Sequence, residues 1–430
     1  MRMNISFTKR GGARRAPAFA AGCVAILAML AAARAARAQP IVELPADSAQ
    51  GPATALPRET AVENALGRGG ILQGSAFGGY GELTLNAPGK YVLDSPPEAT
   101  IDLRRFVLFF GHNFSDRLRF YSEFEVEHAV SSAGDRGEAE VEQAYLDGLV
   151  SRRISLRGGL MIMPVGIINV YHEPPTFNGV DRPAVDTYVV PTTWREPGVG
   201  IFGELREGVR YQLYVVNGFD ANGFTAESAL REGHQEAQFA HAGDWGGVAR
   251  LDWEPRLGTI FGGSAYYATS GNSLTSTVGK VPVTLLEADA RTRVGGFTAR
   301  AEVAFLFIGD AAGLDAAQRD AAVAAGAAAP DPVASQSRGG YVEAGYDMLR
   351  VLAPGSDQSV TLFGRFDYAD TQASVPAGFV ANPAFRRTIY TAGLTYRPIM
   401  QIALKLDYRR HVFGEGPGGN EIAAAITWMF

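Results

Sequence analysis

The stretch "LRFYSEFEVEH", Leu118 to His128, alternates apolar and polar side chains with a period of two. Successive side chains of a β-strand point to opposite faces, so this segment predicts a strand with one apolar and one polar side. Its polar face carries Arg119, Glu123 and Glu125. One such strand fits a soluble sandwich as well as a membrane barrel, and the rest of the chain has to decide between them.

The same pattern recurs along most of the sequence. Many of the segments are about ten residues or longer, which is the length that a tilted strand needs to cross a bilayer, whereas sandwich strands are usually about five or six residues long. The sequence predicts sixteen strands, near residues 75–86, 100–111, 117–129, 140–150, 153–163, 197–205, 208–217, 244–254, 257–269, 280–290, 293–308, 338–350, 358–369, 386–397, 400–410 and 420–430.

The connections alternate in length. Most connections after even-numbered strands are tight turns, while long links follow odd-numbered strands, among them 164–196, 218–243, 309–337 and 370–385. Short periplasmic turns and long outer loops characterise outer-membrane barrels. The sequence therefore predicts an all-β protein, a transmembrane antiparallel β-barrel of about 16 strands over residues 74–430.

The N-terminal 38 residues have the pattern of a secretory signal peptide. A basic leader precedes an apolar stretch from about Ala16 to Ala33, and Ala36-Arg37-Ala38 forms a small-x-small cleavage site. Residues 39–73 are rich in Pro, Ala and Gly without strand or helix periodicity, which indicates a flexible periplasmic extension. We expect export through a cleaved signal peptide to the outer membrane of a Gram-negative bacterium.

Removal of the leader changes the charge and the cysteine content. The leader holds seven of the 39 basic residues and none of the 45 acidic ones, so the remainder has 32 basic residues and a formal net charge of −13. Nucleic acid is therefore not an expected partner. Cys23 is the only cysteine, so disulfides and cysteine metal sites are excluded from residues 39–430.

The last segment, "AAAITWMF" (423–430), continues the alternation to its final residue. We expect this strand to close the barrel against the first one. A final strand that ends in phenylalanine also resembles the signal read by the bacterial barrel-assembly machinery, which makes Trp428 and Phe430 the candidate assembly signal and that machinery an expected partner.

The polar strand faces carry a recurring pair of opposite charges at positions i and i+2, which point the same way on a strand. We expect these residues to face a water-filled lumen and to sort solutes by charge, although a network that braces the wall would need the same residues. The pore-lining and constriction candidates are Arg119, Glu123, Glu125, Arg157, Arg182, Arg195, Arg250, Asp252, Arg300, Glu302, Arg365, Asp367, Lys405, Asp407 and Arg409.

The link from Pro164 to Pro197 (here called the third loop) contains six prolines and charges of both signs. It is too hydrophobic for a flexible tip, so we expect it to fold into the lumen and narrow it. An extracellular flap or a latch between subunits is the alternative. A sixteen-stranded barrel is too wide to be filled by its own wall side chains, so a water-filled channel is expected.

Four stretches resemble the phosphate-selective porin O and P family: "RGGLMIMPVGIINVYHEPPTF" (157–177), "RPAVDTYVVPTTWREPGVGIFGEL" (182–205), "QLYVVNGFDANGF" (212–224) and "RGGYVEAGYDM" (338–348). The resemblance implies a sixteen-stranded outer-membrane porin that is usually trimeric and has an inward-folded third loop. Lysines along the pore accompany phosphate selectivity in that family. Residues 39–430 contain only Lys90, Lys280 and Lys405, and arginine would have to replace the missing lysines.

No catalytic or metal motif emerges. The six histidines are scattered, "HEPPT" at 172–176 lacks the second histidine of a zinc-binding HExxH motif, and "DANG" at 220–223 is a turn sequence first. We expect neither an enzyme nor a cofactor. The expected function is passive diffusion of small hydrophilic solutes, with anions such as phosphate as candidates. A barrel specific for a carbohydrate or organic acid, and a non-conducting adhesion or structural barrel, are the alternatives.

Overall fold

The computed structural model describes residues 74–89, 98–132, 134, 136–271 and 278–430. All of them belong to one compact unit, residues 51–430. The expected signal peptide (1–38) and N-terminal extension (39–73) lie outside the described residues. Lys90, one of the three lysines discussed above, lies outside them as well.

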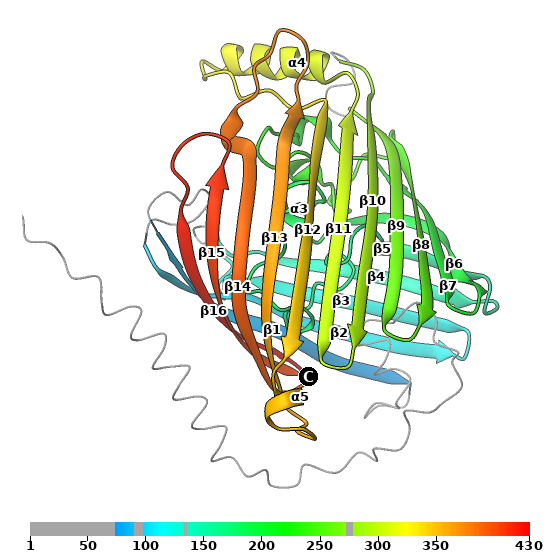
Figure 1. The fold of residues 1–430 in the computed structure, drawn as a ribbon. Coiled ribbons are helices and arrows are strands. Elements are labelled where there is room, and N and C mark those ends of the chain that lie inside the picture. The colour runs from blue at the N-terminus through cyan, green and yellow to red at the C-terminus, as the bar shows by residue number, and fades with distance from the viewer. Residues whose placement is uncertain (1–73, 90–97, 133, 135, 272–277) are drawn as a thin grey trace, which may run out of the picture. The chain divides into compact units, whose positions relative to one another are not determined.

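The described chain forms a closed antiparallel barrel in which each strand pairs with its neighbours in sequence (Figure 1). All sixteen expected strands are present, so the predicted fold class is confirmed. They are β1 (Ser75–Pro88), β2 (Thr100–Ser115), β3 (Leu118–Glu127), β4 (Ala139–Leu149), β5 (Ser155–Ile162), β6 (Arg195–Arg206), β7 (Val209–Asn217), β8 (Trp245–Arg256), β9 (Thr259–Ser270), β10 (Val281–Val294), β11 (Phe297–Ile308), β12 (Gln336–Asp347), β13 (Ser359–Ser374), β14 (Arg386–Ile399), β15 (Ile402–Phe413) and β16 (Asn420–Met429).

Short turns and long loops segregate to opposite ends of the barrel (Figure 1). Strand β2 runs four residues further than expected, so only residues 116 and 117 separate it from β3. The helical elements lie in the connections, and none of the described helices has the length and apolar character needed to cross a membrane. They are η1 (Pro174–Thr176), α3 (Val185–Tyr188), η2 (Ala221–Gly223), η3 (Arg231–Gly233), α4 (Ala311–Ala324), α5 (Leu349–Leu352) and η5 (Pro383–Phe385).

The last strand closes the barrel, as expected. Strand β16 pairs with β1 from Glu421 to Met429. Beyond that ladder, the amide of Gly79 donates to the carbonyl of Phe430 at 3.0 Å, and the amide of Phe430 donates back at 2.9 Å. Backbone pairing therefore extends to the final residue. The ring of Phe430 is exposed and Trp428 is partly exposed, on the apolar outer side of β16.

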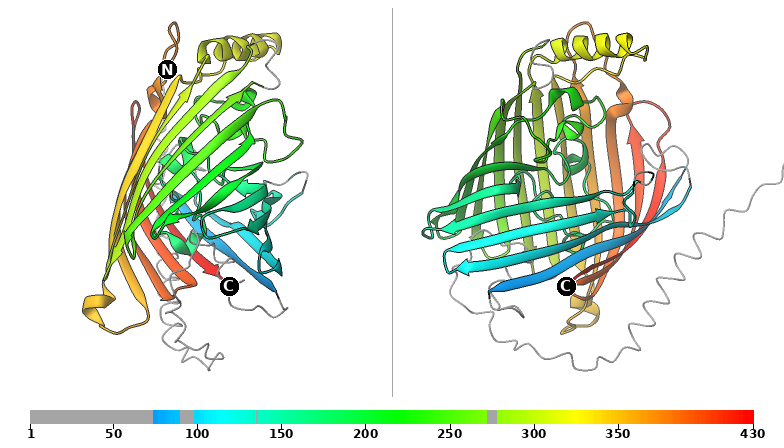
Figure 2. Two further views of the ribbon diagram at one scale, coloured as in Figure 1. Left: turned by 90° about the vertical axis from the view of Figure 1, so that its right-hand side faces the viewer. Right: turned by 180° about the vertical axis from the view of Figure 1, so that it is seen from behind.

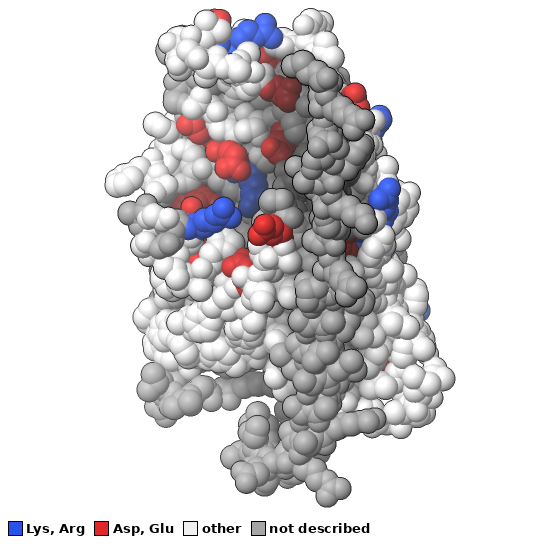
Figure 3. All heavy atoms as spheres, turned by 90° about the vertical axis from the view of Figure 1, so that its left-hand side faces the viewer, with Lys and Arg blue, Asp and Glu red and all other residues white. Residues whose placement is uncertain are grey.

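The two faces of the wall differ in chemistry. Exposed apolar side chains such as Phe124, Leu251 and Phe366 alternate with buried charged ones such as Glu123, Arg250 and Arg365. In Figure 3, acidic and basic groups gather in the upper half of the view, above a broad band of uncharged atoms. An apolar exterior around a polar interior is the arrangement of transmembrane barrels.

Two strands contain a bulge that alters this alternation. In β2 the pairing register with β1 skips Arg104, and in β4 the register with β3 skips Glu142. An extra residue in one strand shifts the phase of the side chains that follow it. Arg104 and Arg105 therefore both reach interior partners, and Glu142 and Gln143 are both buried.

Candidate functional site

The third loop runs from Met163 to Trp194 in the structure and lies inside the barrel, as expected. Its short helix α3 lies within the barrel, close to β11, β12 and β13 (Figures 1 and 2). Most of its apolar side chains are buried, among them Ile167, Val185 and Trp194. They join Met161 of β5 and Leu306 of β11 in one apolar cluster, so the main core of this barrel forms around the loop rather than under a helix layer.

Carboxylates of the wall hold the backbone of the third loop. The amide of Ile167 donates to Glu302 at 2.9 Å. The amide of Val180 donates to Asp407 at 2.7 Å, and that of Ala184 donates to Asp367 at 3.0 Å. Hydrogen bonds to charged groups contribute about 1.5–3 kcal/mol each, so these contacts fix the loop on β11, β13 and β15.

Basic side chains on the same strands bind the loop's carbonyl oxygens. Arg300 donates to Thr176 at 2.6 Å, and Lys405 donates to Gly179 at 2.8 Å. The Lys405 ammonium also lies 3.9 Å from the centre of the Phe177 ring. The opposite-charge pairs on β11 and β15 therefore hold the loop, a role that differs from the bracing of the wall considered in the sequence analysis.

Arg365 and Asp367 on β13 bind each other, and each of them also binds the third loop. Arg365 donates to Asp367 at 2.8 Å and to the carbonyl of Asp181 at 3.1 Å. Arg250 and Asp252 on β8 differ, because Arg250 contacts Asp252 at 2.8 Å, Asp289 at 2.6 Å and Glu287 at 3.4 Å, all within the wall. Neither acid of β10 was among the residues predicted from the sequence.

A cavity of ≈ 320 Å³ lies between the third loop and the strands around the β1–β16 junction. Its walls carry six arginines but three carboxylates, Glu82, Asp181 and Glu421. The sequence pointed to three of the arginines; the other three lie on the bulged β2 and in the loop before β8. The six are Arg104, Arg105, Arg182, Arg231, Arg365 and Arg409.

Asp181 lies among these arginines. It pairs with Arg104 at 2.6 Å and with Arg409 through a short contact. Burial opposes its ionisation, but Arg409 and Arg104 outweigh burial and hold the pKa of the Asp181 carboxyl well below its usual range. Burial lowers the pKa of Arg182 to about 10, so its guanidinium stays charged at neutral pH. One Nη atom of Arg182 is buried and has no hydrogen-bond partner among the described residues.

The remaining basic candidates lie on the side formed by β3 to β6. Arg157 forms a two-point pair with Asp147 at 2.7 and 2.8 Å and lies 4.0 Å above the Tyr145 ring. Arg119 stands opposite Asp147 in the pairing of β3 with β4. Arg195 contacts Glu140 at 2.5 Å and Glu236, in the loop before β8, at 3.2 Å. It does not line the arginine-rich cavity.

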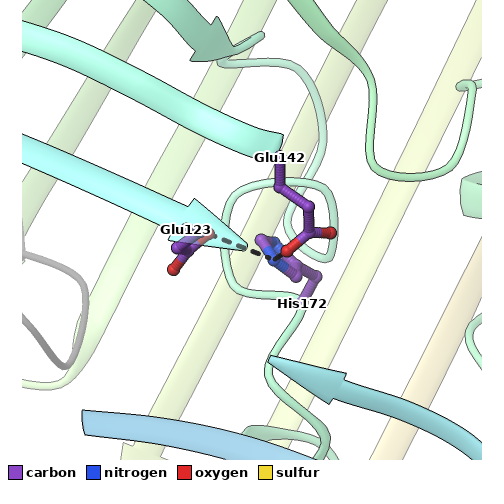
Figure 4. Close-up of side chains that lie close together, drawn as sticks. All are labelled: Glu123, Glu142 and His172. Carbon is purple, nitrogen blue, oxygen red and sulfur yellow. Dashed lines mark ion pairs between the residues drawn. The ribbon is translucent and has the colours of Figure 1, made fainter. Parts of the chain in front are cut away.

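Glu123 and Glu125, the acidic candidates of β3, contact residues that were not predicted from the sequence to lie near them. Glu123 lies 4.0 Å from Nε2 of His172 in the third loop, and Glu142 of β4 lies 3.7 Å from the same atom (Figure 4). Burial would lower the pKa of His172, but Glu142 and Glu123 outweigh burial and raise it. Glu125 instead lies 3.8 Å from Arg105. Only the docked loop brings this histidine to these strands, so spacing along the chain gives no signal for the cluster.

Comparison with known sequences finds a relative over most of the chain. No family model matches the chain. An Aquifex aeolicus (strain VF5) protein, described as an uncharacterized protein, is 34% identical over 364 residues, which are 84% of this chain and 81% of the relative.

Solved structures with a similar fold are outer-membrane proteins. The channel DcaP of Acinetobacter baumannii matches with a TM-score of 0.52 at 12% identity, over 83% of this chain and 97% of that one. OmpF of Salmonella typhi, in complex with daunomycin, gives 0.52 at 14% identity over the same shares. A loop L8 deletion mutant of Vibrio cholerae OmpT gives 0.51 at 9% identity, over 83% and 99%. The chain thus has the fold of outer-membrane porins.

Proposed function

We propose that this chain, which belongs to the same family as the Aquifex aeolicus relative, forms a channel for passive diffusion of small hydrophilic solutes across the outer membrane. It favours anions, with phosphate as the leading candidate. The observation that carries this preference is the cavity beside the third loop, where six arginines face three carboxylates. Guanidinium groups suit oxyanions because they donate two parallel hydrogen bonds and stay charged.

We also propose a route to the membrane and an assembled state. Residues 1–38 act as a cleaved signal peptide, residues 39–73 remain in the periplasm, and the barrel-assembly machinery reads Trp428 and Phe430. The resemblance to the phosphate-selective porins supports a homotrimer. The apolar exterior of the wall supports residence in a lipid bilayer. No step in this function needs an enzyme activity.

A planar lipid bilayer tests the function directly. The reversal potential of the folded protein across a KCl gradient should show preference for chloride over potassium, and added phosphate should reduce the chloride current. A cation-selective channel would contradict the anion preference while leaving a porin. Block by an organic acid or a sugar, without block by phosphate, would favour a barrel specific for that solute. Absence of conductance from protein of verified fold would overturn the channel itself.

A further inference from the structure

We propose that Glu123, Glu142 and His172 bind a divalent transition-metal ion such as Zn²⁺, which ties the third loop to the barrel wall. The two carboxylates come from the neighbouring strands β3 and β4, and the imidazole comes from the loop (Figure 4). One donor atom from each of the three residues lies within 4.8 Å of the other two. The inference does not depend on which solute the channel carries.

The two separations between His172 and the carboxylates are close to those that a common ion requires. Zinc binds imidazole nitrogen and carboxylate oxygen at about 2.0–2.2 Å, which puts neighbouring ligand atoms of a tetrahedral site about 3.3–3.6 Å apart. The distances from Nε2 of His172 to Glu142 and Glu123, 3.7 and 4.0 Å, exceed this range by a few tenths of an ångström. Small side-chain rotations would close that gap. Imidazole combined with carboxylate favours a transition metal over Mg²⁺ or Ca²⁺.

Neighbouring groups already orient the three ligands. Nδ1 of His172 lies 3.1 Å from the carbonyl of Asn169, which fixes the ring with Nε2 directed at the carboxylates. Tyr80 donates to Glu142 at 3.2 Å, and Gln143 donates to Glu123 at 2.7 Å. Both of these hydrogen bonds end on Oε2, the carboxylate oxygen that also faces Nε2 of His172, so they hold those oxygens toward the imidazole. Hydrogen bonds that orient the ligands are typical of metal sites.

The site also holds polar atoms that the protein leaves unsatisfied. His172 and Glu142 are buried, and Nε2 of the one and Oε1 of the other have no hydrogen-bond partner among the described residues. Two further buried carboxylates in this region, Glu125 and Glu173, each have one oxygen atom that also lacks a hydrogen-bond partner among the described residues. Buried charges are costly unless they are paired or coordinate a metal. A divalent cation would satisfy the histidine and offset part of this negative charge.

The alternative occupant of this space is a proton. A charged His172 would form an ion pair with Glu142, but their 3.7 Å separation is longer than a hydrogen bond. An ion pair and a metal site can be distinguished by experiment. A histidine–glutamate ion pair forms without metal, so added metal would produce no binding signal at these residues.

Metal binding should be measured on the full-length protein, processed by the cell, extracted from outer membranes without a histidine tag and stripped with chelator. Titration calorimetry with Zn²⁺ should show one equivalent bound per chain. Co²⁺ should give visible absorption bands that Zn²⁺ abolishes. The variants His172→Gln and Glu142→Gln should weaken Zn²⁺ binding at least ~10-fold. The matched control His128→Gln alters a part-exposed histidine paired with Asp102 and should bind as the wild type does.

Three results would overturn the site. The first is a folded wild-type barrel that neither binds Zn²⁺ nor gives Co²⁺ bands. The second is equal binding by His172→Gln and the wild type, which would place the ion elsewhere. The third is loss of binding in His128→Gln alone. Because the Co²⁺ spectrum is recorded on the wild type, the proposal stays testable even if a variant fails to fold.

Discussion

The third loop meets the barrel wall on two sides, and the two sides differ in how their polar atoms are satisfied. Against β11, β13 and β15, loop amides meet carboxylates and loop carbonyls meet Lys or Arg, as with Val180 and Asp407 at 2.7 Å. Against β3 and β4, carboxylates face an imidazole whose Nε2 makes no hydrogen bond within the described part of the chain. On the first side the backbone groups of the loop have wall partners, although Oε1 of Glu302 and both carboxylate oxygens of Asp186 lack a partner among the described residues. On the second side the unpartnered nitrogen of His172 lies beside carboxylates from two strands.

This difference separates two uses of buried charge. A buried group with all its partners contributes to stability and position, while one that lacks partners costs free energy until something binds. Charged residues of the wall that look alike in the sequence therefore have different structural roles. Arg300 holds a loop carbonyl, Arg250 braces the wall, and Arg409 contributes to an arginine-rich cavity.

The largest effect should come from breaking the contacts of the loop with β11, β13 and β15. Asp407→Ala removes the acceptor of the Val180 amide and leaves Arg409 without one of its carboxylates. Breaking a buried pair on one side costs about 3–5 kcal/mol, so we expect a loss of that order in denaturant unfolding. The current noise of the open channel should also rise, because the loop is freed. Asp252→Ala, which breaks a pair within the wall, should destabilise the barrel without that noise, and equal noise in both variants would contradict the clamp.

A smaller loss is expected from Lys405→Met. The change keeps the apolar stem but removes the hydrogen bond to Gly179 and the contact with the Phe177 ring. Together these contribute about 2 kcal/mol. Denaturant unfolding measures the loss, and unchanged stability would show that Lys405 does not hold the loop.

A pH effect is also expected from Asp186 in α3. Burial, and next Glu287, raise the pKa of Asp186 to about 8, with Asp367 adding to the rise and Arg182 and Arg365 opposing it. A carboxyl with a raised pKa stabilises the fold at low pH, and that contribution declines as the pH rises from about 4 through about 8.

The variant Asp186→Asn removes this titration. It should therefore gain stability relative to the wild type as the pH is raised from 5 to 9. Unfolding midpoints of both proteins across that range measure the difference. A constant difference between the two proteins would show that Asp186 titrates normally.

The strands were predictable because the alternation of apolar and polar residues reports directly on the two faces of a wall. Leu118–Glu127 illustrates this, since Phe124 is exposed while Glu123 and Glu125 are buried. The short turns followed from the same reading, and so did the inward third loop, from its prolines and apolar character. These are local properties of the chain.

The sites were less predictable because each depends on a bulge and on a docked loop. Simple alternation allows only one of Glu142 and Gln143 to face inward, but the extra residue in β4 directs both of them inward. The bulge at Arg104 similarly directs a second arginine of β2 into the cavity. His172 joins β3 and β4 only because the whole loop is folded in. Strand periodicity contains none of this information.

The ion selectivity of Arg182→Gln tests the central claim most directly. Arg182 lines the cavity, so its charge acts on an anion that enters it. Arg350→Gln removes the same charge from an exposed position on α5 and serves as the control. We predict that the KCl reversal potential shifts away from chloride preference in Arg182→Gln and stays at the wild-type value in Arg350→Gln. An unchanged potential in Arg182→Gln, or equal shifts in both variants, would contradict an arginine-lined passage beside the third loop.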